Sequence, residues 1–348
     1  MFIHRAARDA VAAASDAGSA ASLRRRHWRF LAALLASLVT LIVLPYLPTV
    51  SDSTYCRHSR LFWNSTDCVK YALHGTRADI LLVGDSSLVF GIRPDVIERE
   101  TGLSAYNLGL PAGAVLFYPR MLLDHYLALN GKPRLIVLCA SPWTYVRKQN
   151  DLPHLWADAL RFTLRHGSLE QIVELVSRDP RWLIQFPALV MQQEEWRHVD
   201  LSLKTWRQMN EEIDAGRGWL AYRNLSQYGR PVPTLPDDPE LSAKPVGTPD
   251  QAMIERFRRT YERQGIRVAF YVSSIPISDP SYPQVIRAYS GLADNHPRTL
   301  PDRFFVDDGW RIHLVAAGTQ PASLQMSRFI ERFLRHSASP AGRDTAGR

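Results

Sequence analysis

Cysteine is scarce in this chain: three of its 348 residues are cysteines, and only Cys56 and Cys68 lie near each other. No histidine stands beside them at metal-ligand spacing, so a metal site is the least favoured use of this pair. The net charge is +8, yet outside the N-terminus no dense Lys/Arg stripe alternates with aromatic residues. The composition therefore argues against nucleic-acid binding and favours a basic protein of the cell envelope or membrane surface. The sequence contains no internal repeat and predicts no cofactor.

Long hydrophobic runs are also scarce, and one is long enough to cross a membrane. Phe30–Leu47 contains eighteen residues without a charge, which just spans a hydrocarbon core of about 30 Å. Trp28 and Tyr46 stand where interfacial aromatics belong. Basic residues precede the run and few follow it, which predicts a cytoplasmic N-terminus; they are Arg24, Arg25, Arg26 and Arg29. The alternative is a cleaved signal peptide, for which the residues after Leu47 offer only a weak cleavage site.

The predicted organisation of the chain follows from this anchor. It comprises a cytoplasmic tail (1–27), a transmembrane anchor (28–50), a connector (51–77), a globular domain (78–335) and a disordered tail (336–348). If the connector lies in an oxidising compartment, Cys56 and Cys68 are able to form a disulfide there. The alternative is two free buried thiols.

The globular domain alternates short apolar runs with helical stretches, which predicts an α/β fold with a mostly parallel sheet covered on both faces. The expected strands are Ala78–Val83, Leu103–Leu108, Arg134–Ala140, Ile266–Val272 and Arg303–Val306. The expected helices are a short one from Pro94 to Gly102, then Leu116–Leu129, Pro249–Gln264 and Gln320–Arg335. The alternation breaks down at about 143–245, where five of the nine tryptophans follow Trp143; we interpret this region as a helical insertion.

A serine directly follows the first buried strand, in Val83-Gly84-Asp85-Ser86-Ser87-Leu88. The carboxyl edge of the sheet is where open α/β folds place their sites. A turn there presents the hydroxyl of Ser86 together with its own backbone N–H, which suits an oxyanion. Gly, Asp and Ser are also ordinary turn and N-cap residues, so the position after a hydrophobic strand is what favours a site.

Two later stretches complete the candidate site. Gly109 and Gly113 follow the second strand and are candidate oxyanion N–H donors, although a Gly/Pro turn explains them equally well. His313 follows the last expected strand, with Asp307 and Asp308 just upstream. This arrangement suits a general base that is oriented by a carboxylate.

In this order, the three stretches resemble the SGNH (GDSL-like) hydrolase superfamily, in the membrane-anchored form found with bacterial polysaccharide O-acetylation systems. The resemblance covers about residues 78–145 and 265–335. It implies a flavodoxin-like three-layer sandwich, with Ser86 as nucleophile and His313 as base. Asp308 or Asp307 would orient the base, and Gly109 or Gly113 would match the oxyanion-hole glycine.

Two departures from the family pattern stand out. The third strand ends Cys139-Ala140-Ser141-Pro142-Trp143, without the Asn that donates to the oxyanion. Trp310 occupies the expected Asp position, and Asp308 stands five residues before His313, so the loop must bulge for the two to meet. A Ser–His dyad and an inactive relative are therefore alternatives.

The resemblance implies a serine esterase or O-acyltransferase that acts on acyl esters of a cell-surface glycan. It also implies a single-pass protein of the bacterial inner membrane with a periplasmic domain, and a polytopic membrane acyltransferase as partner. The alternative is an inactive envelope protein that binds glycan or serves as a scaffold.

Overall fold

The computed structural model describes residues 27–40, 66, 69–110, 117–146, 163, 167–178, 206–221 and 233–336. The chain divides into two units, Met1–Asp52 and Ser53–Arg348. In the first unit, residues 27–40 form a helix with exposed side chains. Among the described residues, no helix is both long enough and apolar enough to span a membrane. The rest of the run that ends at Leu47 lies outside the described residues, as do Cys56 and Cys68 of the predicted disulfide.

The second unit is built on a four-stranded, fully parallel sheet in the order β2-β1-β3-β4. The strands are β1 (Ile80–Gly84), β2 (Ala105–Asn107), β3 (Leu135–Ala140) and β4 (Arg267–Val272). The two central strands, β1 and β3, are buried along their whole length. This explains why the sequence shows them as continuous apolar runs rather than alternating ones. The predicted α/β class with a mostly parallel sheet is confirmed.

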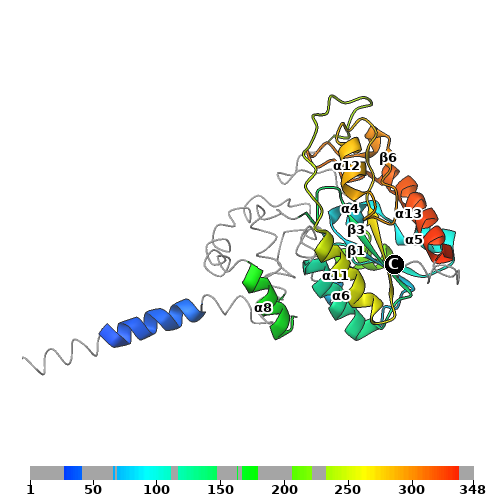
Figure 1. Ribbon diagram of the computed structural model, residues 1–348. Helices are drawn as coiled ribbons and strands as arrows, with labels where there is room; N and C mark the ends of the chain where they lie inside the picture. Colours follow the sequence, from blue (N-terminus) through cyan, green and yellow to red (C-terminus); the bar gives the residue numbers. More distant parts are fainter. Residues whose placement is uncertain are drawn as a thin grey trace, which may run out of the picture. The chain divides into compact units, whose positions relative to one another are not determined.

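Helices cover both faces of this sheet (Figure 1). On one face, α5 (Pro94–Thr101) and α13 (Ala316–His336) share a core with the strands. That core includes Leu82 and Val137 from the sheet and Phe329 from α13. On the other face lie α6 (Phe117–Asn130) and α11 (Gln251–Glu262), which are tied together because the Tyr261 hydroxyl donates to Asp124 Oδ1 at 2.7 Å.

The prediction of a fifth strand at Arg303–Val306 is wrong. Residues Asp302–Phe304 form a 3₁₀ turn, η4, and Phe305 pairs instead with Leu314. Pro301 begins this turn with no N–H to offer a neighbouring strand, and the run is too short to join the main sheet. β5 (Ile275–Pro276) and β6 (Thr299–Leu300) form a separate two-stranded parallel sheet. In the chain, α12 (Tyr282–Tyr289) lies between these two strands.

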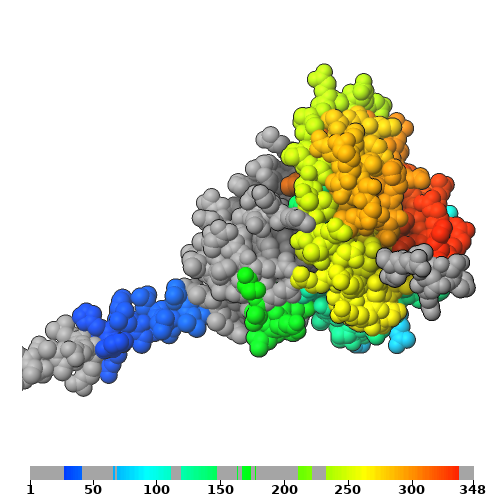
Figure 2. Space-filling view, in the orientation of Figure 1, coloured from blue at the N-terminus to red at the C-terminus, as the bar shows by residue number. Residues whose placement is uncertain are grey.

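The predicted insertion at about 143–245 is described in part. It contains α8 (Leu169–Arg178) and α10 (Trp206–Ala215), and it ends in a run without helix that begins at residue 233. This run continues as a yellow-green band over the surface beside the orange atoms that include α12 (Figure 2). We call residues 233–246 the insertion arm, because it contacts the loop that contains His313.

Candidate active site

The serine loop begins where β1 and β3 come closest. A Cβ atom on Gly84 would lie 2.1 Å from the carbonyl oxygen of Cys139 on β3, so only glycine fits at this position. Its role is this close approach between two strands, because its φ lies outside the left-handed region. The next residue, Asp85, caps the short helix α4 (Ser86–Gly91). Ser86 is therefore placed at the carboxyl edge of the sheet, at the first residue of a helix.

Asp85 fixes this loop to the neighbouring strand end. Its side chain is buried and accepts four hydrogen bonds. Oδ1 accepts from the amide and hydroxyl of Ser87, at 2.9 and 2.5 Å. Oδ2 accepts from the Ser141 amide at 2.9 Å and the Thr144 hydroxyl at 2.7 Å. No asparagine occurs at 141–146, just after β3, and the polar residues Ser141 and Thr144 bind Asp85 there.

The negative charge of Asp85 also acts on its buried neighbours. Burial raises the pKa of the Cys139 thiol, the charge of Asp85 raises it further, and a hydrogen bond from Ser273 partly opposes this. Ser273 in turn contacts Ser87, with 2.7 Å between the two hydroxyl oxygens. Asp85 was not singled out as a site residue from the sequence. The signal that identifies it is an acidic N-cap placed directly after a buried strand.

The structure brings Ser86, His313 and Asp308 together in one hydrogen-bonded chain. Ser86 Oγ lies 2.9 Å from His313 Nε2, and His313 Nδ1 bonds to Asp308 Oδ2. Because an ionised carboxylate only accepts, the ring proton belongs on Nδ1 and Nε2 is left to accept from the serine hydroxyl. Both Ser86 and His313 are largely buried, at 8% and 5% exposed. The Phe90 ring meets the imidazole edge-on, with 5.6 Å between the centroids, and limits its movement.

A tight turn makes the five-residue spacing between Asp308 and His313 workable. Asp308 Oδ1 accepts the Trp310 amide at 2.9 Å, while its other oxygen meets the imidazole. Gly309 and Arg311 both have left-handed backbone, with φ of 77° and 60°. The chain therefore bulges at residues 308–311, which we call the Asp308 turn. Asp307 is exposed and its described contact is a backbone one, an N–H donated to Pro233, so it does not contact the ring.

The structure does not offer Gly109 as an oxyanion donor. Its N–H donates to Asn107 Oδ1 at 2.9 Å, because the Asn107 amide is oriented by two further bonds, to the carbonyls of Leu88 and Ile92. Among the described residues, the Ser86 N–H, at the first position of α4, is left as the candidate oxyanion donor. Gly113, the other predicted donor, lies outside the described residues.

Within the described parts of the chain, no three His, Cys, Asp or Glu side chains are grouped so that they could hold a metal ion. Comparison of the chain with protein-family models, with curated proteins and with solved structures gives no match. The chemistry is therefore inferred from the site itself. A serine, a histidine and a carboxylate in this order can transfer a proton away from the hydroxyl and generate a nucleophile.

Proposed function

We propose that this chain is a serine acyl-transfer enzyme with Ser86 as nucleophile. The observation that carries the proposal is the chain of contacts from Ser86 through His313 to Asp308. Ser86 Oγ would attack the carbonyl carbon of an ester while its proton passes to His313 Nε2. The alcohol then leaves with that proton, and an acyl group remains on Ser86. An incoming hydroxyl, from water or a second alcohol, reverses these steps and frees the serine.

The particular enzyme we propose is a membrane-anchored, SGNH-like esterase or O-acyltransferase of the bacterial envelope. Supporting this, the strand order 2-1-3-4 matches the flavodoxin-type order, and Ser86 follows β1, next to the point where that order reverses. The substrate class would be O-acyl esters of a cell-surface glycan, and a polytopic membrane acyltransferase would supply the acyl group. The anchor at Phe30–Leu47 would place the domain in the periplasm.

A fluorophosphonate probe tests the nucleophile, because it reacts with activated serines. We expect purified full-length protein to be labelled, and Ser86→Ala to abolish labelling. Ser87→Ala is the matched control, since its hydroxyl contacts Asp85 and Ser273 rather than the imidazole. Labelling that persists in Ser86→Ala, or that is lost equally in Ser87→Ala, would contradict the proposal.

The second candidate is an inactive glycan-binding or scaffold protein on the same fold. It is favoured by the shortage of oxyanion donors, since the Gly109 N–H is engaged and the Asn after β3 is missing. Loss of one such donor costs on the order of a hundredfold or more in rate. A strain carrying Ser86→Ala separates the candidates. If it retains surface-polymer acetylation that deletion of the whole chain removes, the scaffold function is correct.

Hydrolysis and transfer are separated by the fate of the acyl group. We expect full-length protein given an activated acetyl ester to release acetate in buffer alone. If the natural reaction is transfer, adding glycan oligosaccharides diverts the acetyl group to sugar hydroxyls, which mass spectrometry detects as acetylated oligosaccharide. Release of acetate that is unchanged by any oligosaccharide would support an esterase.

A further inference from the structure

The Asp308 turn is held by the insertion arm rather than by the sheet. Thr234 forms an antiparallel bridge with Val306, two residues before Asp308. The Asp307 amide donates to the Pro233 carbonyl at 2.8 Å. Residues that belong to the insertion in sequence thus run beside the segment that carries the carboxylate. The position of Asp308 therefore depends on contacts made by this arm.

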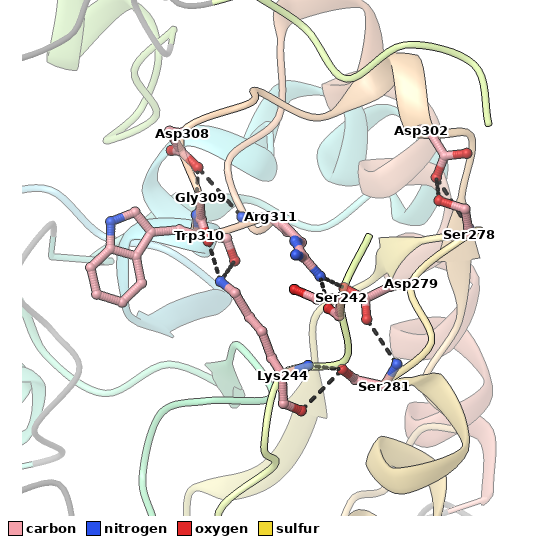
Figure 3. A network of polar contacts seen from close by, with 10 residues as sticks. All are labelled: Ser242, Lys244, Ser278, Asp279, Ser281, Asp302, Asp308, Gly309, Trp310 and Arg311. Carbon is pink, nitrogen blue, oxygen red and sulfur yellow. Dashed lines mark hydrogen bonds and ion pairs between the residues drawn. The ribbon is translucent and has the colours of Figure 1, made fainter. Parts of the chain in front are cut away.

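Lys244 of the insertion arm reaches into the turn itself. Its Nζ donates to the carbonyl oxygen of Gly309 and, at 3.2 Å, to that of Trp310 (Figure 3). The ammonium group also lies 5.2 Å from the ring centre of Trp143 and 5.8 Å from that of Trp310. A cation over an aromatic face is attracted by the ring's quadrupole. Four contacts therefore converge on one lysine side chain, and three of them involve the turn or its indole.

The backbone of Lys244 is fixed in turn by Ser281, at the start of α12. The Lys244 amide donates to Ser281 Oγ at 2.7 Å, and the Ser281 hydroxyl donates to the Lys244 carbonyl, with 3.0 Å between the oxygens. The Ser281 amide donates to Asp279 Oδ1 at 2.8 Å. Lys244 is thus attached to the α/β unit on one side and to the turn on the other.

Arg311 forms a second connection from within the turn. Its guanidinium donates to the Ser242 carbonyl at 2.8 Å and to Asp279 Oδ2 at 3.3 Å, and the Asp279 side chain is fully buried. The left-handed backbone of Arg311 costs about 1–2 kcal/mol of conformational free energy. The turn therefore needs such contacts to keep this conformation. Lys244 and Arg311 are close enough for the charge of Arg311 to lower the pKa of Lys244, after the larger effect of burial.

We infer that Lys244 and Arg311 are positioning residues that hold the Asp308 turn and so keep the Asp308 carboxylate on His313 Nδ1. This inference rests on the proposed function, because it assigns a role in that reaction. It also explains how a carboxylate reaches His313 although Trp310 occupies the position where the resemblance leads one to expect an Asp. The bulged turn replaces the shorter Asp-to-His spacing, and the insertion arm supplies the contacts that such a turn lacks on its own.

A double-mutant cycle with fluorophosphonate labelling rates tests the inference. We expect Lys244→Met to slow labelling about tenfold to a hundredfold, since small misplacements of catalytic groups cost up to about a hundredfold. In an Asp308→Asn background, the same substitution should change the rate less than about twofold, because its route to the imidazole is already broken. Equal slowing in both backgrounds, or no slowing in either, would overturn it. Lys244→Arg should restore most of the rate, because arginine keeps the charge and the donors.

Lys132→Met is the matched control, because this lysine also donates to a backbone carbonyl, that of Gln264 at 3.1 Å, at an exposed place outside the site. It should leave the labelling rate unchanged. Lys244 is a better probe than Arg311, whose removal would leave the buried Asp279 carboxylate without its cation and endanger folding.

A readout that needs no activity separates failure of this inference from failure of the proposed function. In ¹⁵N-histidine-labelled full-length protein, the His313 Nδ1 proton bonded to Asp308 should give a low-field NMR signal, which Asp308→Asn removes. Lys244→Met should broaden or remove that signal, and Lys132→Met should keep it. A signal unchanged in Lys244→Met would overturn the positioning role. Absence of labelling in the wild type, with the NMR signal behaving as expected, would instead refute only the proposed enzyme.

Discussion

Ser86 and Asp308 belong to the same hydrogen-bonded chain, but the molecule holds them in different ways. Ser86 stands at the end of a central strand, and the adjacent Asp85 is bonded to four donors on α4 and after β3. Asp308 stands in an irregular loop between η4 and α13, and its turn is held by the Lys244 side chain of the insertion arm and by its own hydrogen bonds. One half of the site is thus part of the core, and the other depends on an added segment.

Because of this difference, we expect substitutions in one half of the site to affect mainly stability and substitutions in the other half to affect mainly activity. Changes to Gly84 and Asp85 should disturb the sheet, because Gly84 packs directly against β3 and Asp85 binds the residues that follow it. Changes to Asp308 and Gly309 should leave the fold intact, because neither residue lies in a regular element. The insertion arm is an addition to the α/β core. We therefore expect substitutions in this arm to change the reactivity of the site with little effect on the core.

The largest expected effect is on activity, from Asp308→Asn. The amide would present a donor or a weaker acceptor to His313 Nδ1, so the imidazole would favour the tautomer that cannot accept the serine proton. We expect labelling and ester cleavage to fall about 10⁴-fold, while the free energy of unfolding changes by about 1 kcal/mol. Rate measurements together with urea unfolding of the same sample check both parts. A loss of stability as large as the loss of activity would contradict the contrast between the two halves.

Gly84→Ala should show the opposite pattern. The new methyl group would lie 2.1 Å from the Cys139 carbonyl oxygen, so β1 and β3 must separate. We expect a loss of about 3 kcal/mol or more in unfolding free energy. Gly309→Ala, in the Asp308 turn, meets no atom within 4 Å and should cost only about 1 kcal/mol for its left-handed backbone. Equal losses in thermal or urea unfolding would show that the serine loop is not confined by the sheet.

Asp85→Asn should reduce stability and activity together. The amide group would turn an N–H donor toward two of the four donors that the carboxylate now satisfies. We expect a loss of about 3 kcal/mol in unfolding free energy, and slower labelling because α4 is no longer fixed. Urea unfolding and probe kinetics measure the two effects. Unchanged stability would mean that this buried carboxylate does not anchor the loop.

The smallest effect concerns the thiol of Cys139, on the core side of the site. Burial raises its pKa, so the folded protein should resist iodoacetamide at pH 8 and react at this residue only when unfolded, as peptide mapping will show. The unfolded thiol ionises near its usual pKa of about 8.5, whereas the folded one does not. Stability should therefore fall as the pH rises above that value. Rapid labelling of the native protein at Cys139 would contradict the account.

The sequence was sufficient for the parts of the molecule that follow from local pattern. Continuous apolar runs predicted the central strands, and the serine and histidine that follow strand-like runs predicted which side chains meet. The role of Gly109 was not predictable, because it depends on how the Asn107 amide is turned by carbonyls on a different element. Lys244 was missed for the same kind of reason, since nothing in its neighbourhood in the sequence indicates that it contacts a turn 65 residues later.

The most direct test of the central claim is to look for the acyl-enzyme itself. Full-length protein is mixed with p-nitrophenyl acetate, quenched in acid within the first turnovers and digested for peptide mapping by mass spectrometry. We predict an acetyl group on Ser86 in the wild type and none in His313→Gln, because the serine then has no base. Absence of acetyl-Ser86 in the wild type, or equal acetylation in His313→Gln, would contradict the assignment of Ser86 as a nucleophile activated by His313.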